Sequence, residues 1–291
     1  MGHVLVVGSV NVDRIVRIAR PLGAGGRVSV LGAHWRCGGG GFATGAALLA
    51  LGHRVSLVAT LSADAAGEAC RAVLAQLGFD LRYLAASEAP TVPLEIFVDP
   101  AGERTIVAPA ASEARRLTTL PALAADLAYI NVRRAEAGVL DALAGRCRVV
   151  AQVPLEAGER RPAEALIASA SDHAFALGEG AFDHARRIGG DGLKVLVATD
   201  GARPVHLSEA HGRMQVPLAP VELPEGGPRD STGAGDVFAA GFIDGCLRGE
   251  PYAACAQRGS EIAARFLADR KALWGDAALA LDMSLRSAAG P

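Results

Sequence analysis

Lysine is almost missing from this chain of 291 residues, which has it only at Lys194 and Lys271. A P-loop kinase needs a lysine that follows its phosphate-binding glycines and precedes a serine or threonine. Val195 follows the first lysine and Ala272 follows the second, so the sequence excludes the P-loop class. The preference for arginine over lysine indicates a bias in genome composition rather than a function.

The chain also has few cysteines, few aromatic residues and no long apolar run. Its five cysteines are an odd number without a Cys-x-x-Cys pair, which argues against structural zinc and predicts free thiols in a reducing cytosol. No apolar run reaches the ~20 residues of a membrane-spanning helix. The formal net charge is −2, so no overall positive field attracts nucleic acid or anionic lipid. We expect a cytoplasmic protein with no nucleic acid and no membrane as partner.

Short apolar segments alternate with helical ones along the chain. The run 4–7 is apolar throughout, as in a strand that is buried on both faces of a parallel sheet. A helical pattern over 42–51 ends at Gly52, a strand follows over 55–60, and Asp64 is placed to cap the next helix. Later strands are predicted at 127–132, 148–153, 173–177 and 194–198, an antiparallel edge within 205–221, and helices at 235–247 and 251–268.

Two stretches depart from this alternation. Residues 14–35 and 91–108 each contain strand patterns around turn-forming residues, which indicates antiparallel ribbons that pair into a small lid over a site. The sequence therefore predicts an α/β fold with three layers, α/β/α, a mainly parallel central sheet and a small β-ribbon lid. The core comprises 1–13, 36–90 and 109–291. An exposed ribbon edge invites pairing, so a homodimer through the lid is expected.

The segment 230–238 carries the strongest chemical signal. It reads Asp-Ser-Thr-Gly-Ala-Gly-Asp-Val-Phe and leads into an apolar helical run. A helix N-terminus exposes unpaired N–H groups and the positive end of the helix dipole, and glycines let a phosphate approach closely. Asp236 stands in the first turn beside this anion site, where a carboxylate can take the proton of an attacking hydroxyl. We predict that Asp236 is a general base.

This motif resembles the C-terminal signature of the ribokinase family of carbohydrate and nucleoside kinases, also called the phosphofructokinase B family. The resemblance extends in order along nearly the whole chain and implies a ribokinase-like fold. It implies that Asp236 is the catalytic base and that the N–H groups of Gly233, Ala234 and Gly235 form the anion hole. It also implies that ATP and Mg²⁺ take part, and that Asp230 belongs to a loop that in many members holds a monovalent cation such as K⁺.

Two further segments resemble family motifs that contact the acceptor substrate. The segment 8–13, Gly-Ser-Val-Asn-Val-Asp, is similar to the first strand of the family, whose acidic residue binds sugar hydroxyls. This resemblance implies substrate-binding roles for Asn11 and Asp13. Four consecutive glycines resemble the N-terminal signature, where backbone amides meet the substrate, and this implies that Gly38 and Gly39 also contact it.

On the nucleotide side, Thr199 and Gly201 lie where the family turns from a strand beneath the phosphates. The resemblance implies that they bind the nucleotide together with Gly233 and Gly235. After an earlier strand the family usually shows Asn-x-x-Glu, which arranges magnesium-bound water. This chain has Glu179 between two glycines at that place, and Glu179 is the metal-binding residue that we expect there.

The glycine-rich segment departs from the family at two positions. Many sugar kinases carry a lysine at the position of Gly40 and an asparagine at the position of Ala43. Their absence argues against ribose as the substrate and for a pocket with fewer polar contacts. Asn131 and Arg133 end another predicted strand, where some fructose kinases place polar residues, and Arg133 is expected at the surface.

The residues favour a kinase but leave other functions open. A dinucleotide-dependent dehydrogenase is excluded because no Gly-x-Gly-x-x-Gly follows the first strand. We predict ATP-dependent phosphorylation of a primary hydroxyl on a small sugar or sugar-like substrate. A purine nucleoside kinase is the alternative within the family, since Phe42 and Ala43 leave an apolar floor for a base. A catalytically weak sugar-binding sensor is the alternative of another class, motivated by the missing Asn-x-x-Glu.

Overall fold

A nine-stranded sheet is the main element of the computed structural model, which describes residues 1–110, 116–143, 145–156, 158–222 and 230–281. Its strand order is β13-β12-β11-β10-β9-β8-β1-β4-β5. Neighbouring strands from β5 to β11 run parallel, and β12 and β13 add an antiparallel edge. The strands are β1 (His3–Gly8), β4 (Arg54–Ser62), β5 (Leu84–Ser87), β8 (Leu127–Asn131), β9 (Arg148–Gln152), β10 (Ala165–Ser169), β11 (Val195–Asp200), β12 (Arg203–Glu209) and β13 (Gly212–Val216).

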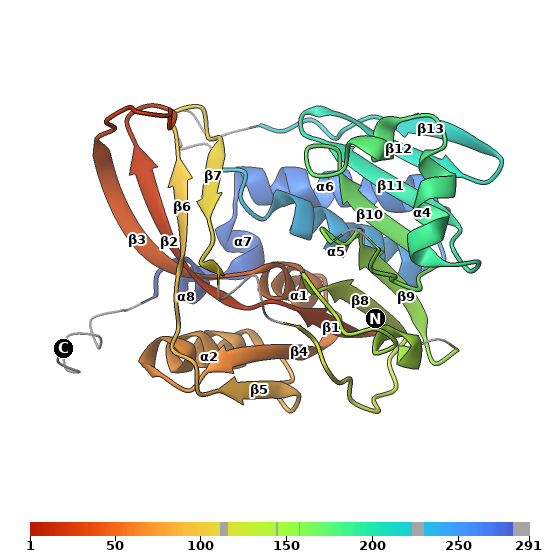
Figure 1. Ribbon diagram of the computed structural model, residues 1–291, viewed down its shortest axis with the longest axis horizontal. Coiled ribbons are helices and arrows are strands. Elements are labelled where there is room, and N and C mark those ends of the chain that lie inside the picture. Colours follow the sequence, from red (N-terminus) through yellow and green to blue (C-terminus); the bar gives the residue numbers. More distant parts are fainter. Residues whose placement is uncertain (111–115, 144, 157, 223–229, 282–291) are drawn as a thin grey trace.

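Strand β1 shows why this sheet is covered on both faces. Val4 and Val6 pack into one core cluster and Leu5 and Val7 into a second, because successive side chains of a strand point to opposite faces. On the first face lie α1 (Gly40–Ala50), α2 (Ala65–Leu77), α5 (Ala234–Leu247) and α6 (Tyr252–Ala268). On the second lie α4 (Ala181–Gly189) and the 3₁₀ helices η1 (Leu140–Leu143) and η2 (Ala174–Leu177) (Figure 1). The predicted three-layer α/β/α fold is confirmed.

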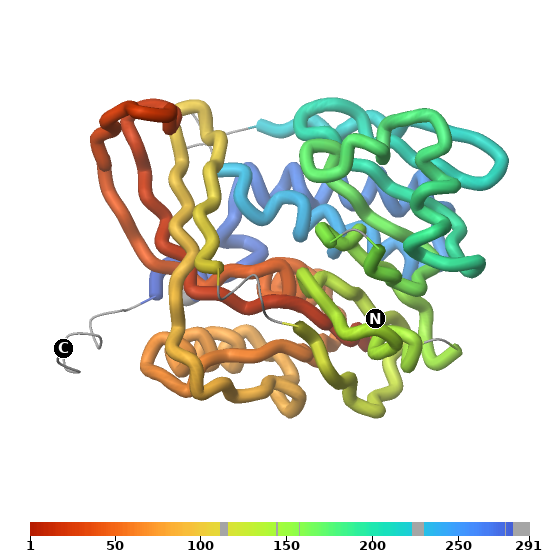
Figure 2. The backbone as a smooth tube through the Cα atoms, in the orientation of Figure 1, coloured from red at the N-terminus to blue at the C-terminus, as the bar shows by residue number. Residues whose placement is uncertain are grey.

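A second sheet of four strands forms the lid beside this core. Its order is β3-β2-β6-β7, with β2 (Asn11–Ile18), β3 (Val30–Gly38), β6 (Leu94–Val98) and β7 (Arg104–Val107). The two predicted ribbons are β2 with β3 and β6 with β7, and they join through a parallel pairing of β2 with β6 (Figure 2). Two short helices, α7 (Lys271–Trp274) and α8 (Asp276–Leu279), lie near the base of the lid (Figure 1).

One predicted strand is wrong. Residues 174–177 form the 3₁₀ helix η2, and the strand of this region is β10, which begins at Ala165. A short apolar run reads equally well as strand or helix. The segment 165–169 is almost fully buried and pairs with β9 on one side and β11 on the other, so it forms the strand at this place in the sheet.

Two other local predictions concern helices. The predicted cap of α2 is confirmed, since the Asp64 carboxylate accepts a hydrogen bond from the Gly67 N–H at 2.9 Å. The helix predicted over 42–51 starts earlier, at Gly40. Among the helices that the structure describes, none has the length and apolar character needed to cross a membrane.

Candidate functional site

The carboxyl ends of the central strands open onto a cavity of about 240 Å³ beneath the lid. Parallel strands place their carboxyl ends at one edge of a sheet, and Gly8 at the end of β1 is paired with Asn131 at the end of β8. The cavity is lined from the core by Asn131, Asp236 and Gly233, and from the lid by Asp13 and Arg104. The sheet edge, the start of α5 and the lid therefore meet at one place.

Asp236 lies in the first turn of α5 and faces this cavity. The side-chain N–H of Asn131 donates a hydrogen bond to Asp236 Oδ1 at 2.9 Å, and the Thr44 hydroxyl donates to the backbone oxygen of Asp236 at 3.0 Å. Burial raises the pKa of Asp236, whereas the hydrogen bond from Asn131 and the charge of Arg104 lower it. A carboxylate with a raised pKa is a stronger proton acceptor than one in water.

The absence of a side chain at Gly40 makes room for Asn131. A Cβ atom at Gly40 would lie 2.1 Å from the Asn131 amide nitrogen, far inside contact distance. The lysine that many sugar kinases carry at this position is therefore incompatible with the observed place of Asn131. In this chain the group next to Asp236 at that point is an amide from β8.

Replacing Asn131 with alanine should shift the pH dependence of turnover. The hydrogen bond from Asn131 stabilises the ionised form of Asp236, so its loss raises the pKa of Asp236 further and moves the acid limb of kcat/KM to higher pH. A hydrogen bond to a charged group is worth about 1.5–3 kcal/mol, so kcat/KM at neutral pH should fall at least ~10-fold. Gln152→Leu is the control, since Gln152 lines the same cavity and donates to Tyr129 rather than to Asp236. An unmoved acid limb in Asn131→Ala contradicts the prediction.

The turn that precedes α5 has a backbone shape that suits an anion. Gly233 has φ 90°, a left-handed conformation that favours glycine, and a Cβ there would lie 2.6 Å from the Trp274 ring. The Ala234 N–H already donates to the carbonyl of Ser231 at 3.0 Å. The N–H groups of Gly233 and Gly235 have no backbone acceptor among the described residues, and nothing lies within 4 Å of a Cβ built at Gly235. Of the three predicted anion-hole groups, these two are the available donors.

Asp13 approaches the cavity from the base of the lid. Its pairing places it on β2, two residues after Asn11, rather than at the end of β1. The side chain is 4% exposed, and its Oδ1 atom has no hydrogen-bond partner. A Cβ at Gly38 would lie 1.9 Å from Asp13 Oδ2, so this glycine is required for the position of the carboxylate. Buried polar atoms are normally paired, which marks Oδ1 as a site for a ligand.

Electrostatics distinguish Asp13 from an ordinary surface carboxylate. Burial raises the pKa of Asp13 to about 6; the positive charge of Arg36 opposes this rise, and the negative charges of Asp230 and Asp236 add to it. Asn11, Gly38 and Gly39 line the cavity with Asp13. The structure thus brings together all four residues predicted to contact the acceptor.

The predicted nucleotide and metal residues lie farther along the sheet edge. Thr199 is paired with Ser169, which lines the cavity, but neither Thr199 nor Gly201 is among the lining residues. Glu179 is exposed and does not line it either. Because the strand before this region is β10, the residues that follow its end are 170–173, and Asp172 among them lines the cavity. The displaced strand prediction led to the choice of Glu179 instead.

The sequence reasoning missed three arginines that line the cavity, Arg36, Arg104 and Arg161. Arg161 is 1% exposed and donates to the carbonyls of Val132, Arg133 and Gln152, so it fixes the ends of β8 and β9. Arg104 reaches from the lid strand β7 to the Ser231 hydroxyl at 3.3 Å. No sequence pattern marks a buried arginine in a loop, but the position of Arg104 on a predicted lid strand was a usable signal.

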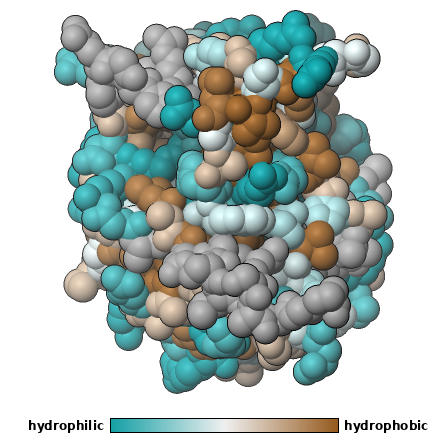
Figure 3. Space-filling view, turned by 90° about the vertical axis from the view of Figure 1, so that its left-hand side faces the viewer, coloured by the Kyte–Doolittle hydropathy of each residue, from teal (hydrophilic) through white to brown (hydrophobic). Residues whose placement is uncertain are grey.

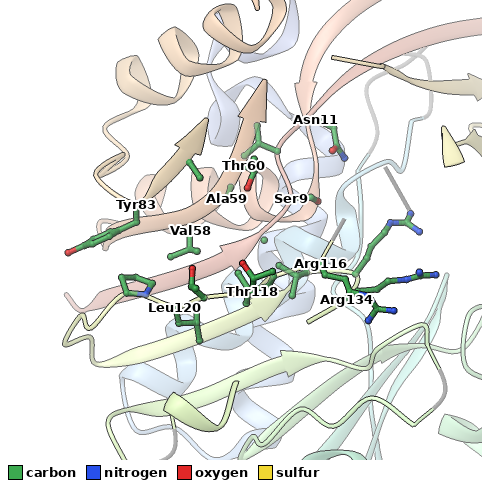
Figure 4. A pocket seen from close by; sticks show the side chains of 18 of the residues that line it. Ser9, Asn11, Val58, Ala59, Thr60, Tyr83, Arg116, Thr118, Leu120 and Arg134 are labelled. Atoms are coloured by element: carbon green, nitrogen blue, oxygen red, sulfur yellow. The ribbon is translucent and has the colours of Figure 1, made fainter. Parts of the chain in front are cut away.

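A second cavity of about 420 Å³ adjoins the first. Both are lined by Ser9, Asn11, Leu94, Val132 and Arg133, and the expected surface position of Arg133 is consistent with its exposure. Figure 4 shows Ala59 and Thr60 on one side and Thr118 and Leu120 on the other, with Tyr83 at one end and Arg116 and Arg134 at the opposite end. The walls are largely apolar, with polar groups at the ends.

Known proteins share parts of this sequence and its fold. Residues 162–272 match the model of the pfkB family carbohydrate kinases. The cytidine kinase of Thermococcus kodakarensis is 36% identical over 96 residues, and this match spans 32% of the chain and 31% of the length of that relative.

Two solved structures extend the similarity of fold to almost the whole chain. The nucleoside kinase of Burkholderia thailandensis in complex with inosine has a TM-score of 0.72 at 16% identity, with 98% of this chain and 96% of that chain covered. Arabidopsis thaliana ribokinase complexed with ribose and ATP has a TM-score of 0.69 at 19% identity, with 94% and 97% covered. Residues 162–272 thus match the pfkB family that the motifs resemble, and the fold over nearly the whole chain is that of ribokinase-like kinases.

Proposed function

We propose that this chain transfers the γ-phosphoryl group of ATP to a primary hydroxyl of a small sugar or sugar-like substrate. The observation that carries the proposal is the place of Asp236. Its carboxylate is partly buried, accepts a hydrogen bond from Asn131, and lies in the first turn of α5 beside the N–H groups of Gly233 and Gly235. A base next to an anion-binding turn is the arrangement that phosphoryl transfer to a hydroxyl requires.

The polar groups at the cavity have separate roles in this reaction. Asp13 accepts hydrogen bonds from acceptor hydroxyls through its unpaired Oδ1, and Asn11 lies beside it. Asp236 takes the proton of the attacking hydroxyl, while the N–H groups of Gly233 and Gly235 receive the transferring phosphoryl group. Arg104 carries a positive charge from the lid to the same turn. Closure of the lid excludes water, which would otherwise accept the phosphoryl group.

Magnesium fits this site with few protein ligands. No group of three acidic, histidine or cysteine side chains that could hold a metal exists in the described ranges. Mg²⁺ keeps several waters and is commonly bound through one or two carboxylates plus substrate phosphates. Asp172, which lines the cavity, is the residue that fits this role, and Glu179 does not reach the cavity. When bound, Mg²⁺ neutralises charge on the phosphates.

A coupled ADP-release assay with ATP and Mg²⁺ tests the proposal across ribose, fructose, other ketoses and aldoses, sugar acids, and nucleosides. The expected result is a rate that depends on one class of acceptor and is lost in Asp236→Asn. Turnover that is independent of any acceptor contradicts the proposal. Absence of turnover, combined with an acceptor that raises the melting temperature, favours the sensor hypothesis instead.

A nucleoside is the second candidate acceptor because of the cavity of about 420 Å³ beside the site. Its apolar walls offer a nucleobase a place that a free pentose would leave empty, while Asn11 and Ser9 border both cavities. The related cytidine kinase and the solved nucleoside kinase complex with inosine support this candidate. In the same assay a nucleoside kinase should prefer the nucleoside over the corresponding free sugar.

The lid is the part of the surface where a second copy should bind. Its edge strand β3 exposes Val30 and Leu31 by 58% and 62%, and Figure 3, which looks onto the lid side, shows brown side chains gathered in its upper half. Edge strands with exposed apolar residues favour pairing. We expect a dimer in sedimentation velocity and a monomer for Leu31→Lys. Met214→Lys, a 52% exposed residue on the far edge strand β13, should stay dimeric, and a monomeric wild-type protein contradicts the prediction.

A further inference from the structure

Asp230, the first residue of the anion-binding segment, has its acceptor atoms engaged by the protein itself. Its Oδ1 accepts the Thr232 N–H at 2.8 Å. Its Oδ2 lies 3.0 Å from Arg36 Nη1 and 3.2 Å from Arg270 Nη1. Its backbone carbonyl accepts Arg270 Nη2 at 2.5 Å. The carboxylate and the carbonyl that would face a cation therefore both face guanidinium groups.

The two guanidinium groups are fixed by aromatic packing. Arg36 and Arg270 lie over the Trp274 ring, 5.7 and 5.2 Å from its centre, and Arg270 also lies 4.6 Å from the centre of the Phe266 ring. Trp274 is 2% exposed, and Arg36 is 2% exposed. Cation–π contacts of this kind hold a planar guanidinium in one orientation. Arg270 thus donates a hydrogen bond to the Asp230 carbonyl while its charge lies beside the Asp230 carboxylate.

This cluster touches the anion-binding turn directly. The Trp274 ring lies 2.6 Å from the position that a Cβ of Gly233 would take, and the N–H of Thr232, one residue before, donates to Asp230. Burial raises the pKa of Asp230, but the charges of Arg270 and Arg36 and the bonds from Thr232 outweigh it and hold that pKa below its usual value. Arg36 and Arg270 therefore place fixed positive charge next to the turn that would receive the phosphoryl group.

The residues at Asp230 do not fit a monovalent cation. Such an ion is held by oxygen ligands, and here the carboxylate and the carbonyl oxygen of Asp230 are covered by nitrogen donors. A cation and the Arg270 guanidinium cannot share these atoms, since like charges in a buried place repel strongly. We propose that Arg270, together with Arg36, supplies at Asp230 the positive charge that a monovalent cation supplies in kinases whose corresponding loop binds one, so that this chain works without K⁺.

The inference has two tests, and the first, a comparison of rates, rests on the proposed kinase activity. Rates are measured at equal ionic strength in the chlorides of K⁺, Na⁺ and N-methylglucamine. The wild-type rate should be the same in all three. Arg270→Met should lower the rate at least ~10-fold and make it respond to K⁺, because the loss of one fixed charge near developing negative charge costs this much or more. Arg270→Lys keeps a positive charge, so its rate and its response to K⁺ should lie between those of the wild type and Arg270→Met.

The second test does not depend on turnover. The melting temperature and the affinity for a non-hydrolysable ATP analogue, measured by calorimetry, should not change between K⁺ and N-methylglucamine in the wild type, and K⁺ should raise both in Arg270→Met. Arg265→Met, an exposed arginine on α6, is the matched control and should behave as the wild type. A wild-type protein that K⁺ stabilises or activates overturns the inference. If no acceptor is phosphorylated, the proposed function fails, and the melting and binding data still decide the question of the cation.

Discussion

Asp236→Asn should lose most of its turnover while it still binds the acceptor and ATP. An amide cannot take the proton of the attacking hydroxyl, and general-base catalysis typically contributes ~10²–10⁴-fold. The fold should tolerate the change, because Asn has nearly the shape of Asp, and burial already raises the pKa of Asp236 so that the neutral form costs little. Single-turnover rates and calorimetric binding of the acceptor measure the two properties separately.

The control for this experiment is a carboxylate of the same chain outside the cavity. Asp183 lies in the first turn of α4, and it does not line the site. Asp183→Asn should keep the wild-type rate. A rate for Asp236→Asn within a small factor of the wild type contradicts the role of Asp236 as the base. If Asp236→Asn fails to bind the acceptor, its lost turnover has a structural cause rather than the loss of a base.

Asp13→Asn should weaken acceptor binding and stabilise the fold at the same time. Burial raises the pKa of Asp13 to about 6, above the ordinary value of an aspartate, so above pH 6 the folded protein carries a charge that burial disfavours. This rise in pKa corresponds to a loss of folding stability of at most about 3 kcal/mol. Because the raised pKa belongs to an acid, this cost is fully present above pH 6 and disappears as the pH falls toward 4. The amide removes it.

Acceptor binding should respond in the opposite direction. Asp13 Oδ1 is a hydrogen-bond acceptor of the cavity that has no partner in the protein. An amide at this position offers the substrate hydroxyls only one oxygen and adds an N–H donor that they do not need. A site that loses a matched polar partner commonly loses ~10²-fold or more in kcat/KM. We expect a higher melting temperature at pH 8, a gain that shrinks at pH 5, and a loss of kcat/KM at both.

Asp80 offers a control for which the expected change in melting temperature has the opposite sign. Its hydrogen bonds with Arg82 are the main cause that holds the pKa of Asp80 below its usual value. Asp80→Asn should therefore lower the melting temperature at neutral pH, and the loss should shrink under acid conditions, since a depressed pKa stabilises the fold only while the group is ionised. If Asp13→Asn melts below the wild type at pH 8, the burial cost assigned to Asp13 is wrong.

Much of the fold could be predicted because the sequence patterns that indicate its elements involve residues close together in the chain. The apolar run in β1, the cap at Asp64 and the paired ribbons of the lid all depend on neighbouring residues, and each is confirmed. The run 173–177 was assigned wrongly, since its length does not separate a strand from a helix and only its lack of sheet partners decides.

The candidate site was predictable where it follows a motif and not where it depends on long-range contacts. Asp236, Gly233, Asp13 and Gly38 come from three motifs, and the structure places them at one cavity. The contacts of Asp230 with Arg36 and Arg270 join residues up to 194 positions apart, and no pattern in the sequence reports such a pairing. The engagement of the Ala234 N–H likewise depends on the exact shape of the turn.

The close approach of Gly40 and Asn131 has a consequence for how this chain can diverge. A lysine at position 40 would collide with Asn131, and loss of Asn131 alone would remove the partner of Asp236. The two positions are therefore expected to show sign epistasis: each single replacement lowers the proposed kinase activity, while Gly40→Lys combined with Asn131→Ala restores part of what both lose. Relatives with a side chain at the first position should carry a small residue at the second.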